Sequence, residues 1–95
     1  MGTVDTKALV VTAGTTLVRT GQGRLAHVLV TGGSTATTLE LYDNGAGVAS
    51  GAKLTSTIKV PIDEFGGAIG IYKRVYNGIT AVLVGTGSEA AVYFD

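Results

Sequence analysis

Fifteen glycines and one proline divide this 95-residue chain at short intervals. The segments between them consist mostly of β-branched and apolar residues, which favour strands. No segment keeps the period of about 3.6 residues that an amphipathic helix requires. Short strands separated by glycine turns at roughly ten-residue spacing are typical of sandwiches and small barrels. We therefore predict an all-β fold, a small antiparallel β-sandwich (jelly-roll-like) of about seven or eight short strands.

The glycine turns also give the expected strand positions. We assign residues 1–6 to a flexible N-terminal arm and residues 7–95 to a single domain, with residues 46–52 as a loop and 65–67 as an irregular segment. The expected strands cover residues 7–12, 16–20, 24–31, 37–42, 54–60, 69–76, 79–84 and 90–94.

The clearest local signal is the dipeptide Asn77-Gly78 between two strand-like runs. Asn-Gly favours a type I′ hairpin because both central residues of that turn need positive φ. The turn would place Tyr76 opposite Ile79, Arg74 opposite Ala81, and Tyr72 opposite Leu83 on one face. Val75, Lys73 and Ile71 would lie on the other face, opposite Thr80, Val82 and Val84.

Both faces of this predicted hairpin are at least half apolar, whereas a solvated antiparallel hairpin has one dry and one wet face. We infer that a neighbouring subunit covers one of them. The alternative is that loops of the same chain do so. The candidate interface residues are Tyr72, Arg74, Tyr76, Ile79 and Leu83.

Composition limits the partners and cofactors. A domain of this size buries only about 60–65% of its surface on folding, and with no Cys and a single His, disulfides or a structural zinc are not expected. Self-association is the expected source of further burial. Seven basic and seven acidic residues balance, so we expect no nucleic-acid partner. We also expect no membrane span, signal peptide, metal or other cofactor.

The chemical motifs favour structural roles. The sequence GQGRLA at residues 21–26 fits a dinucleotide fingerprint, but that motif needs a following helix, and here a strand is predicted. His27 should pack on a face shared with Leu25 and Leu29. Asp63-Glu64 could be read as a metal or acid–base pair, but adjacent side chains point to opposite sides of an extended chain and cannot easily share one substrate. We therefore expect a solvated turn there, and likewise a turn at Asp43-Asn44. No nucleophile is paired with a base, so we predict no enzyme and no catalytic residues.

The order of segments carries a family resemblance. Residues 14–25 (GTTLVRTGQGRL) lead into 28–30 (VLV), then 38–44 (TLELYDN), 78–82 (GITAV) and 91–95 (AVYFD). This series resembles small all-β virion proteins of tailed bacteriophages, of the capsid cement or decoration kind. The resemblance implies a non-enzymatic protein on the capsid surface, made in the host cytoplasm. Its implied partners are further copies of itself, often in a trimer, and the major capsid protein.

A second hypothesis is a carbohydrate-binding module or a receptor-binding fibre or tail domain. Tyrosines at loop ends stack on sugar rings in such proteins, and Tyr42, Tyr72, Tyr76 or Asp43 would supply the contacts.

Overall fold

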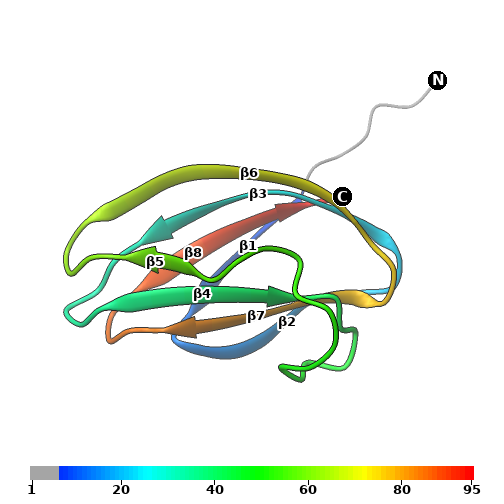
Figure 1. Ribbon diagram of the computed structural model, residues 1–95, viewed down its shortest axis with the longest axis horizontal. Helices are drawn as coiled ribbons and strands as arrows, with labels where there is room; N and C mark the ends of the chain where they lie inside the picture. Colours follow the sequence, from blue (N-terminus) through cyan, green and yellow to red (C-terminus); the bar gives the residue numbers. More distant parts are fainter. Residues whose placement is uncertain (1–6) are drawn as a thin grey trace.

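The computed structural model describes residues 7–95. Within them the chain forms eight strands and no helix, so none that could span a membrane. The strands are β1 (Lys7–Thr12), β2 (Gly14–Thr20), β3 (Gly23–Thr31), β4 (Thr37–Tyr42), β5 (Ile58–Val60), β6 (Phe65–Val75), β7 (Gly78–Val84) and β8 (Glu89–Phe94). In Figure 1 they run roughly along the long axis, with β6 at the upper edge and β2 at the lower. The predicted arm, residues 1–6, lies outside the described residues.

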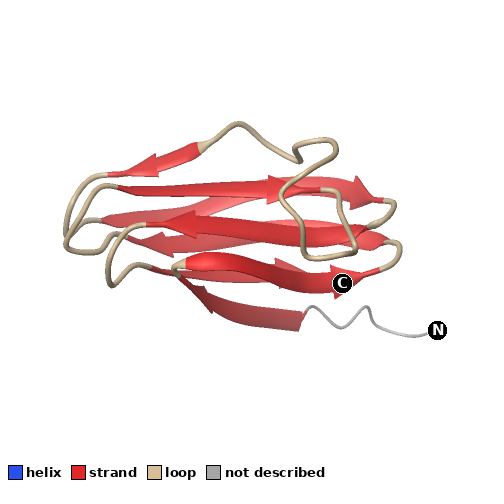
Figure 2. Cartoon of the chain, turned by 90° about the horizontal axis from the view of Figure 1, so that it is seen from below, coloured by secondary structure: helices blue, strands red, loops and turns tan. Residues whose placement is uncertain are grey.

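The strands form two four-stranded antiparallel sheets, in the orders β1-β8-β3-β6 and β2-β7-β4-β5. Successive strands along much of the chain alternate between the sheets, and the first and last strands pair with each other. Eight strands in two sheets with this order make a jelly roll. The view in Figure 2 shows the strands of the two layers connected by loops at both ends. The predicted small antiparallel sandwich is therefore confirmed.

The core lies between the sheets and follows the alternation of side chains along each strand. In β4, Leu39 and Leu41 are fully buried while Glu40 between them is not; in β8, Ala90, Val92 and Phe94 point inward. The other buried hydrophobic residues are Val11, Leu25, Val28, Val30, Leu54, Val60, Val75, Ile79, Ala81 and Leu83.

Two predicted segments differ from the structure. The strand expected over residues 54–60 is regular only in β5, because residues 53–57 turn away after a single bridge between Tyr42 and Lys53. In contrast, the segment 65–67 expected to be irregular begins the longest strand, β6. Gly66 allows this, since a Cβ there would lie 2.8 Å from the Val60 side chain.

The predicted hairpin is wrong in its pairing. β6 pairs with β3 and β7 pairs with β2 and β4, so the chain crosses between the sheets at Asn77. A positive φ occurs at Gly78 but not at Asn77, and a type I′ turn needs it at both. β6 and β7 lie in different sheets, and each turns apolar side chains toward the other sheet across the core. The apolar faces that suggested one hairpin therefore belong to two sheets.

Candidate functional site

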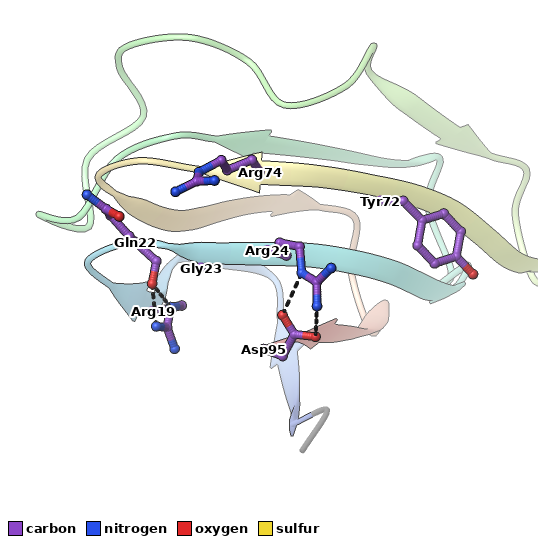
Figure 3. Close-up of a pocket in the computed structure, with 7 residues that line it drawn as sticks. All are labelled: Arg19, Gln22, Gly23, Arg24, Tyr72, Arg74 and Asp95. Atoms are coloured by element: carbon purple, nitrogen blue, oxygen red, sulfur yellow. Dashed lines mark hydrogen bonds and ion pairs between the residues drawn. The ribbon is translucent and has the colours of Figure 1, made fainter. Parts of the chain in front are cut away.

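A hollow lies at the end of the sandwich where β2 turns into β3. It has a volume of about 680 Å³ and is lined by residues of β2, β3 and β6, by the β2–β3 turn and by Asp95, which follows β8 (Figure 3). A smaller hollow of about 280 Å³ adjoins it and shares Arg24, Tyr72 and Asp95. We call the larger hollow the arginine pocket. Its lining residues are Arg19, Gln22, Gly23, Arg24, Tyr72, Arg74 and Asp95.

A forked ion pair stands in the middle of the pocket. Arg24 Nε and Nη2 lie 3.2 and 3.3 Å from the two carboxylate oxygens of Asp95. The same residues exchange backbone hydrogen bonds of 2.9 and 3.0 Å. Asp95 is 16% exposed and Arg24 is 60% exposed, so the carboxylate is fixed in the wall while the guanidinium also faces solvent.

Arg19 occupies one end of the pocket. Its guanidinium donates to the carbonyl oxygen of Gln22, with Nε at 3.1 Å. Gly23 makes room for this arrangement, because a Cβ there would lie 2.5 Å from Arg19 Nε. The glycine of the predicted GQGRLA turn thus lets an arginine lie across the β2–β3 turn, and the motif is a turn between strands, as predicted.

Tyr72 and Arg74 come from the last part of β6. Tyr72 is 77% exposed and has a φ of 52°, which is unusual for a residue with a bulky side chain. Its ring lies over Gly70, where a Cβ would be 2.7 Å from the ring. Arg74 lies with its guanidinium carbon 5.6 Å from the centre of the Tyr76 ring, within the range of a cation–π contact.

A second feature is the outward face of the β1-β8-β3-β6 sheet, which we call the outer face. The register places Val10, Ala91, Leu29 and Ala68 in one row across the four strands, and Ala8, Tyr93, His27 and Gly70 in the next. Val10 is 61% exposed, and Phe65, at the edge of this face, is 65% exposed. Charged residues occur only at its two ends. They are Glu89 at one end and Arg24, Arg74 and Asp95 at the other.

His27 lies on this outer face and stacks on Tyr93, with ring centres 4.2 Å apart and an angle of 14° between the planes. The prediction that His27 shares a face with Leu25 is wrong. The register of β3 shifts between Leu25 and His27, and a bulge of this kind turns the following side chains over. Leu25 is therefore buried in the core, while His27 and Leu29 both point outward.

The five candidate interface residues separate into two groups. Tyr72, Arg74 and Tyr76 are exposed, as an interface requires. Ile79 and Leu83 are 0% and 1% exposed, so they belong to the core and have no surface to offer a partner. They are buried because β7 is a central strand whose inward side faces the opposite sheet.

Asp43 and Asp63-Glu64 were expected to serve turns. Asp63 and Glu64 are exposed in the turn before β6, as predicted. Burial raises the pKa of Asp43, but hydrogen bonds from the backbone N–H groups of Asn77, Tyr76 and Gly78, with the charge of Lys73, outweigh it and hold this pKa below its ordinary value. Asp43 is thus occupied by the backbone rather than available to a ligand.

Another polar cluster is on the opposite sheet. Lys53 Nζ lies 3.0 Å from Glu40 Oε2 and 2.7 Å from Thr57 Oγ1. The Lys53 ammonium is the main reason that the pKa of Glu40 lies below its ordinary value. Within residues 7–95 no three His, Cys, Asp or Glu side chains lie close enough together to hold a metal ion.

Sequence reasoning missed the arginine pocket. Its residues are spread from position 19 to 95, and no short motif joins them. The signal available was the number of arginines beside strand ends, but only the pairing of β3 with both β6 and β8 brings them together. Comparison with protein-family models, curated proteins and solved structures found no match to this chain.

Proposed function

We propose that this chain is a non-enzymatic structural virion protein. It acts as a homo-oligomeric cement or decoration protein, a trimer in the favoured form, that binds the major capsid protein and stabilises a phage capsid shell. The observation that carries the proposal is the apolar outer face. The resemblance of the sequence to such proteins supports it, and jelly rolls are common among capsid domains, although a fold alone does not determine a function.

The outer face has the composition of a covered surface. Antiparallel sheets that meet water usually carry polar residues on the wet side. Here two rows across four strands hold no charged side chain. Four strands about 4.8 Å apart and about six residues long give the face roughly 400 Å². Patches of this size on a monomer are often functional.

The edge of the same sheet carries little charge, although its pairing with β3 shifts register at two points. β6 is an edge strand of 11 residues, and its first eight, Phe65 to Tyr72, contain no charge. Exposed edge strands are normally shielded by charges, proline or short length, because their free N–H and C=O groups pair with other chains. A second copy packed against β6 would remove this liability.

The area favours a ring over a simple pair. A stable interface needs about 800 Å² from each partner, and the outer face alone supplies about half of that. In a closed ring each copy contacts two neighbours through different surfaces. The outer face and the β6 edge can then both be buried. This supports the trimer that the resemblance implies.

The opposite sheet offers a surface for the capsid. Its outward residues include Thr15 and Thr38, which carry hydroxyl groups, and Val84, which is 56% exposed. Hydroxyls and small apolar groups can pack against a rigid shell. Glu40, Lys53 and Lys59 on the same side can pair with charged groups of the partner. A cement protein needs such a surface in addition to its self-association surface.

The proposal is tested by adding a charge to each surface separately. Val10→Asp places a carboxylate on the outer face, and Val84→Asp places one on the opposite sheet as the matched control. We expect Val10→Asp to dissociate the oligomer in light scattering, with unchanged circular dichroism, and Val84→Asp to keep it. Val84→Asp should instead weaken co-sedimentation with assembled capsid shells of the phage whose genome encodes this chain. A wild-type chain that fails to co-sediment with these shells would contradict the capsid role.

A specific observation favours a second candidate, a carbohydrate-binding or receptor-binding domain. Tyr72 is an exposed aromatic beside a pocket lined by polar side chains, which is the combination that sugar sites use. Of the other residues considered for this role, Tyr42 is half-buried and Tyr76 is exposed. A glycan array hit abolished by Tyr72→Ala but kept in Tyr42→Phe would support this function. An array without a hit would remove it.

A further inference from the structure

The arginine pocket concentrates positive charge in a chain whose formal net charge is zero. Three of the seven Lys and Arg residues line it, against a single carboxylate side chain, that of Asp95. Guanidinium groups are always charged near neutral pH, so the pocket has an excess of positive charge. Like charges gathered on one small surface repel one another, and a bound anion would offset the part of this repulsion that Asp95 does not.

Each guanidinium has a different local partner. Arg24 is paired with Asp95 and Arg19 donates to a backbone carbonyl. Arg74 lies over the Tyr76 ring and, among the ion pairs of residues 7–95, has no carboxylate partner. A guanidinium presents five N–H donors in a planar fork. Arg74 therefore has donors to offer a carboxylate, while Arg24 is already fixed in place by the wall.

Tyr72 supplies an apolar surface beside this charge. Figure 3 shows its ring at the other side of the Arg24–Asp95 pair from Arg19 and Gln22. A φ of 52° holds the residue in a left-handed conformation that only glycine and small polar residues adopt readily. Backbone strain of this type is concentrated at functional sites. The strained backbone and the absent Cβ of Gly70 together place an exposed ring at the pocket margin.

We propose that the arginine pocket binds the carboxylate of an acidic sugar, of the uronic or sialic acid type. This proposal rests on the carbohydrate-binding candidate above and names its ligand class. Arg74 and Arg24 would donate to the sugar carboxylate. The Tyr72 ring would pack on the C–H face of the pyranose, and the Gln22 amide and the Asp95 carboxylate would bond its hydroxyls.

The combination distinguishes this ligand from other anions. A free phosphate or acetate would use the guanidiniums but not the Tyr72 ring. A neutral sugar would use the ring and the hydroxyl-binding groups, and would leave Arg74 unpaired. A nucleic acid would need a basic surface far larger than the pocket, and the chain is electrically balanced.

The test is an NMR titration of the ¹⁵N-labelled full chain. The probes are glucuronate, N-acetylneuraminate, glucose, acetate and inorganic phosphate, each added separately. We expect an acidic sugar to shift the amide signals of residues 22–24 and 72–74, and to bind at least about tenfold more tightly than glucose or acetate. The affinity should decrease as salt increases, because the recognition is partly between charges.

Variants separate the role of Arg74 from the role of Tyr72. Arg74→Ala and Tyr72→Phe alter exposed side chains, and Lys59→Ala, which removes an exposed cation from the opposite sheet, is the matched control. We expect Arg74→Ala to weaken the acidic sugar about tenfold without weakening glucose, Tyr72→Phe to retain binding, and Lys59→Ala to have no effect. Tyr72→Ala should weaken acidic and neutral sugars alike.

The outcomes distinguish a failure of the acidic-sugar proposal from a failure of the carbohydrate-binding candidate on which it rests. Equal binding of glucose and glucuronate would overturn the acidic-sugar proposal and leave carbohydrate binding in place. Binding of acetate or phosphate as tight as that of the sugars would overturn it in favour of a simple anion site. No response to any sugar would overturn both the proposal and the carbohydrate-binding candidate, without affecting the capsid role.

Discussion

The Asp43 carboxylate accepts a hydrogen bond of 2.7 Å from the backbone N–H of Asn77, 34 residues further along the chain. The same carboxylate also accepts from the N–H groups of Tyr76 and Gly78, at 3.1 and 3.3 Å. These three N–H groups lie at the point where the chain passes from β6 in one sheet to β7 in the other. One side chain after β4 thus holds the crossing in place.

We predict that Asp43→Ala lowers the free energy of unfolding by about 1.5–3 kcal/mol, because hydrogen bonds to a charged acceptor are lost at three backbone donors. Urea denaturation at one fixed protein concentration measures this change. The matched control is Glu64→Ala, which removes an exposed carboxylate from a turn and should change the free energy by less than about 0.5 kcal/mol. Equal effects of the two variants would contradict the role of Asp43.

The pH dependence of stability follows from the same contact. The pKa of Asp43 in the folded protein lies below its ordinary value of 3.8. The folded state therefore holds fewer protons than the unfolded state in this range, and stability falls as pH falls. The contribution is complete above the ordinary value and is lost as pH drops through the lower folded pKa.

Urea midpoints measured between pH 6 and pH 2, at intervals of about half a unit, test this dependence. Asp43→Asn should flatten the acid limb. A smaller slope should persist in that variant, since the pKa of Glu40 is lowered as well. An acid limb identical in wild type and Asp43→Asn would show that Asp43 does not carry the effect.

A third prediction concerns Asp63, whose φ of 56° lies in the left-handed region. Glycine adopts this conformation without steric cost, although it loses more freedom on folding. We expect Asp63→Gly to raise the free energy of unfolding by about 0.5–1 kcal/mol. Asp63→Ala should give no such gain because alanine keeps the Cβ. A lower stability of Asp63→Gly than of Asp63→Ala, again from urea midpoints, would contradict the strain at this position.

The sequence predicted the layers well and the connections poorly. The bounds of β1 and β4 agree with the predicted segments, because glycine or turn residues limit both. The Asn77-Gly78 signal marked a real change of direction but gave the wrong partner strands. Short-range turn preferences describe the two residues of a turn, whereas pairing depends on which strand buries the inward side chains.

The site was less predictable than the fold. Tyr72 and Arg74 were predicted as interface residues, and the structure places them in the lining of the arginine pocket. Ile79 and Leu83 were assigned to the same surface through the wrong register. His27 was placed with Leu25 because a bulge cannot be seen in an alternating sequence. The arginine pocket depends on strands distant in sequence, so only the three-dimensional pairing brings it together.

The measurement that tests the central claim most directly is the solution mass of the wild-type chain. Light scattering after size-exclusion chromatography, over a dilution series, gives this mass without reference to shape. A persistent multiple of the 9.6 kDa chain, a trimer in the favoured form, is the predicted result. A mass of one chain at every concentration would contradict the claim that further copies cover the outer face.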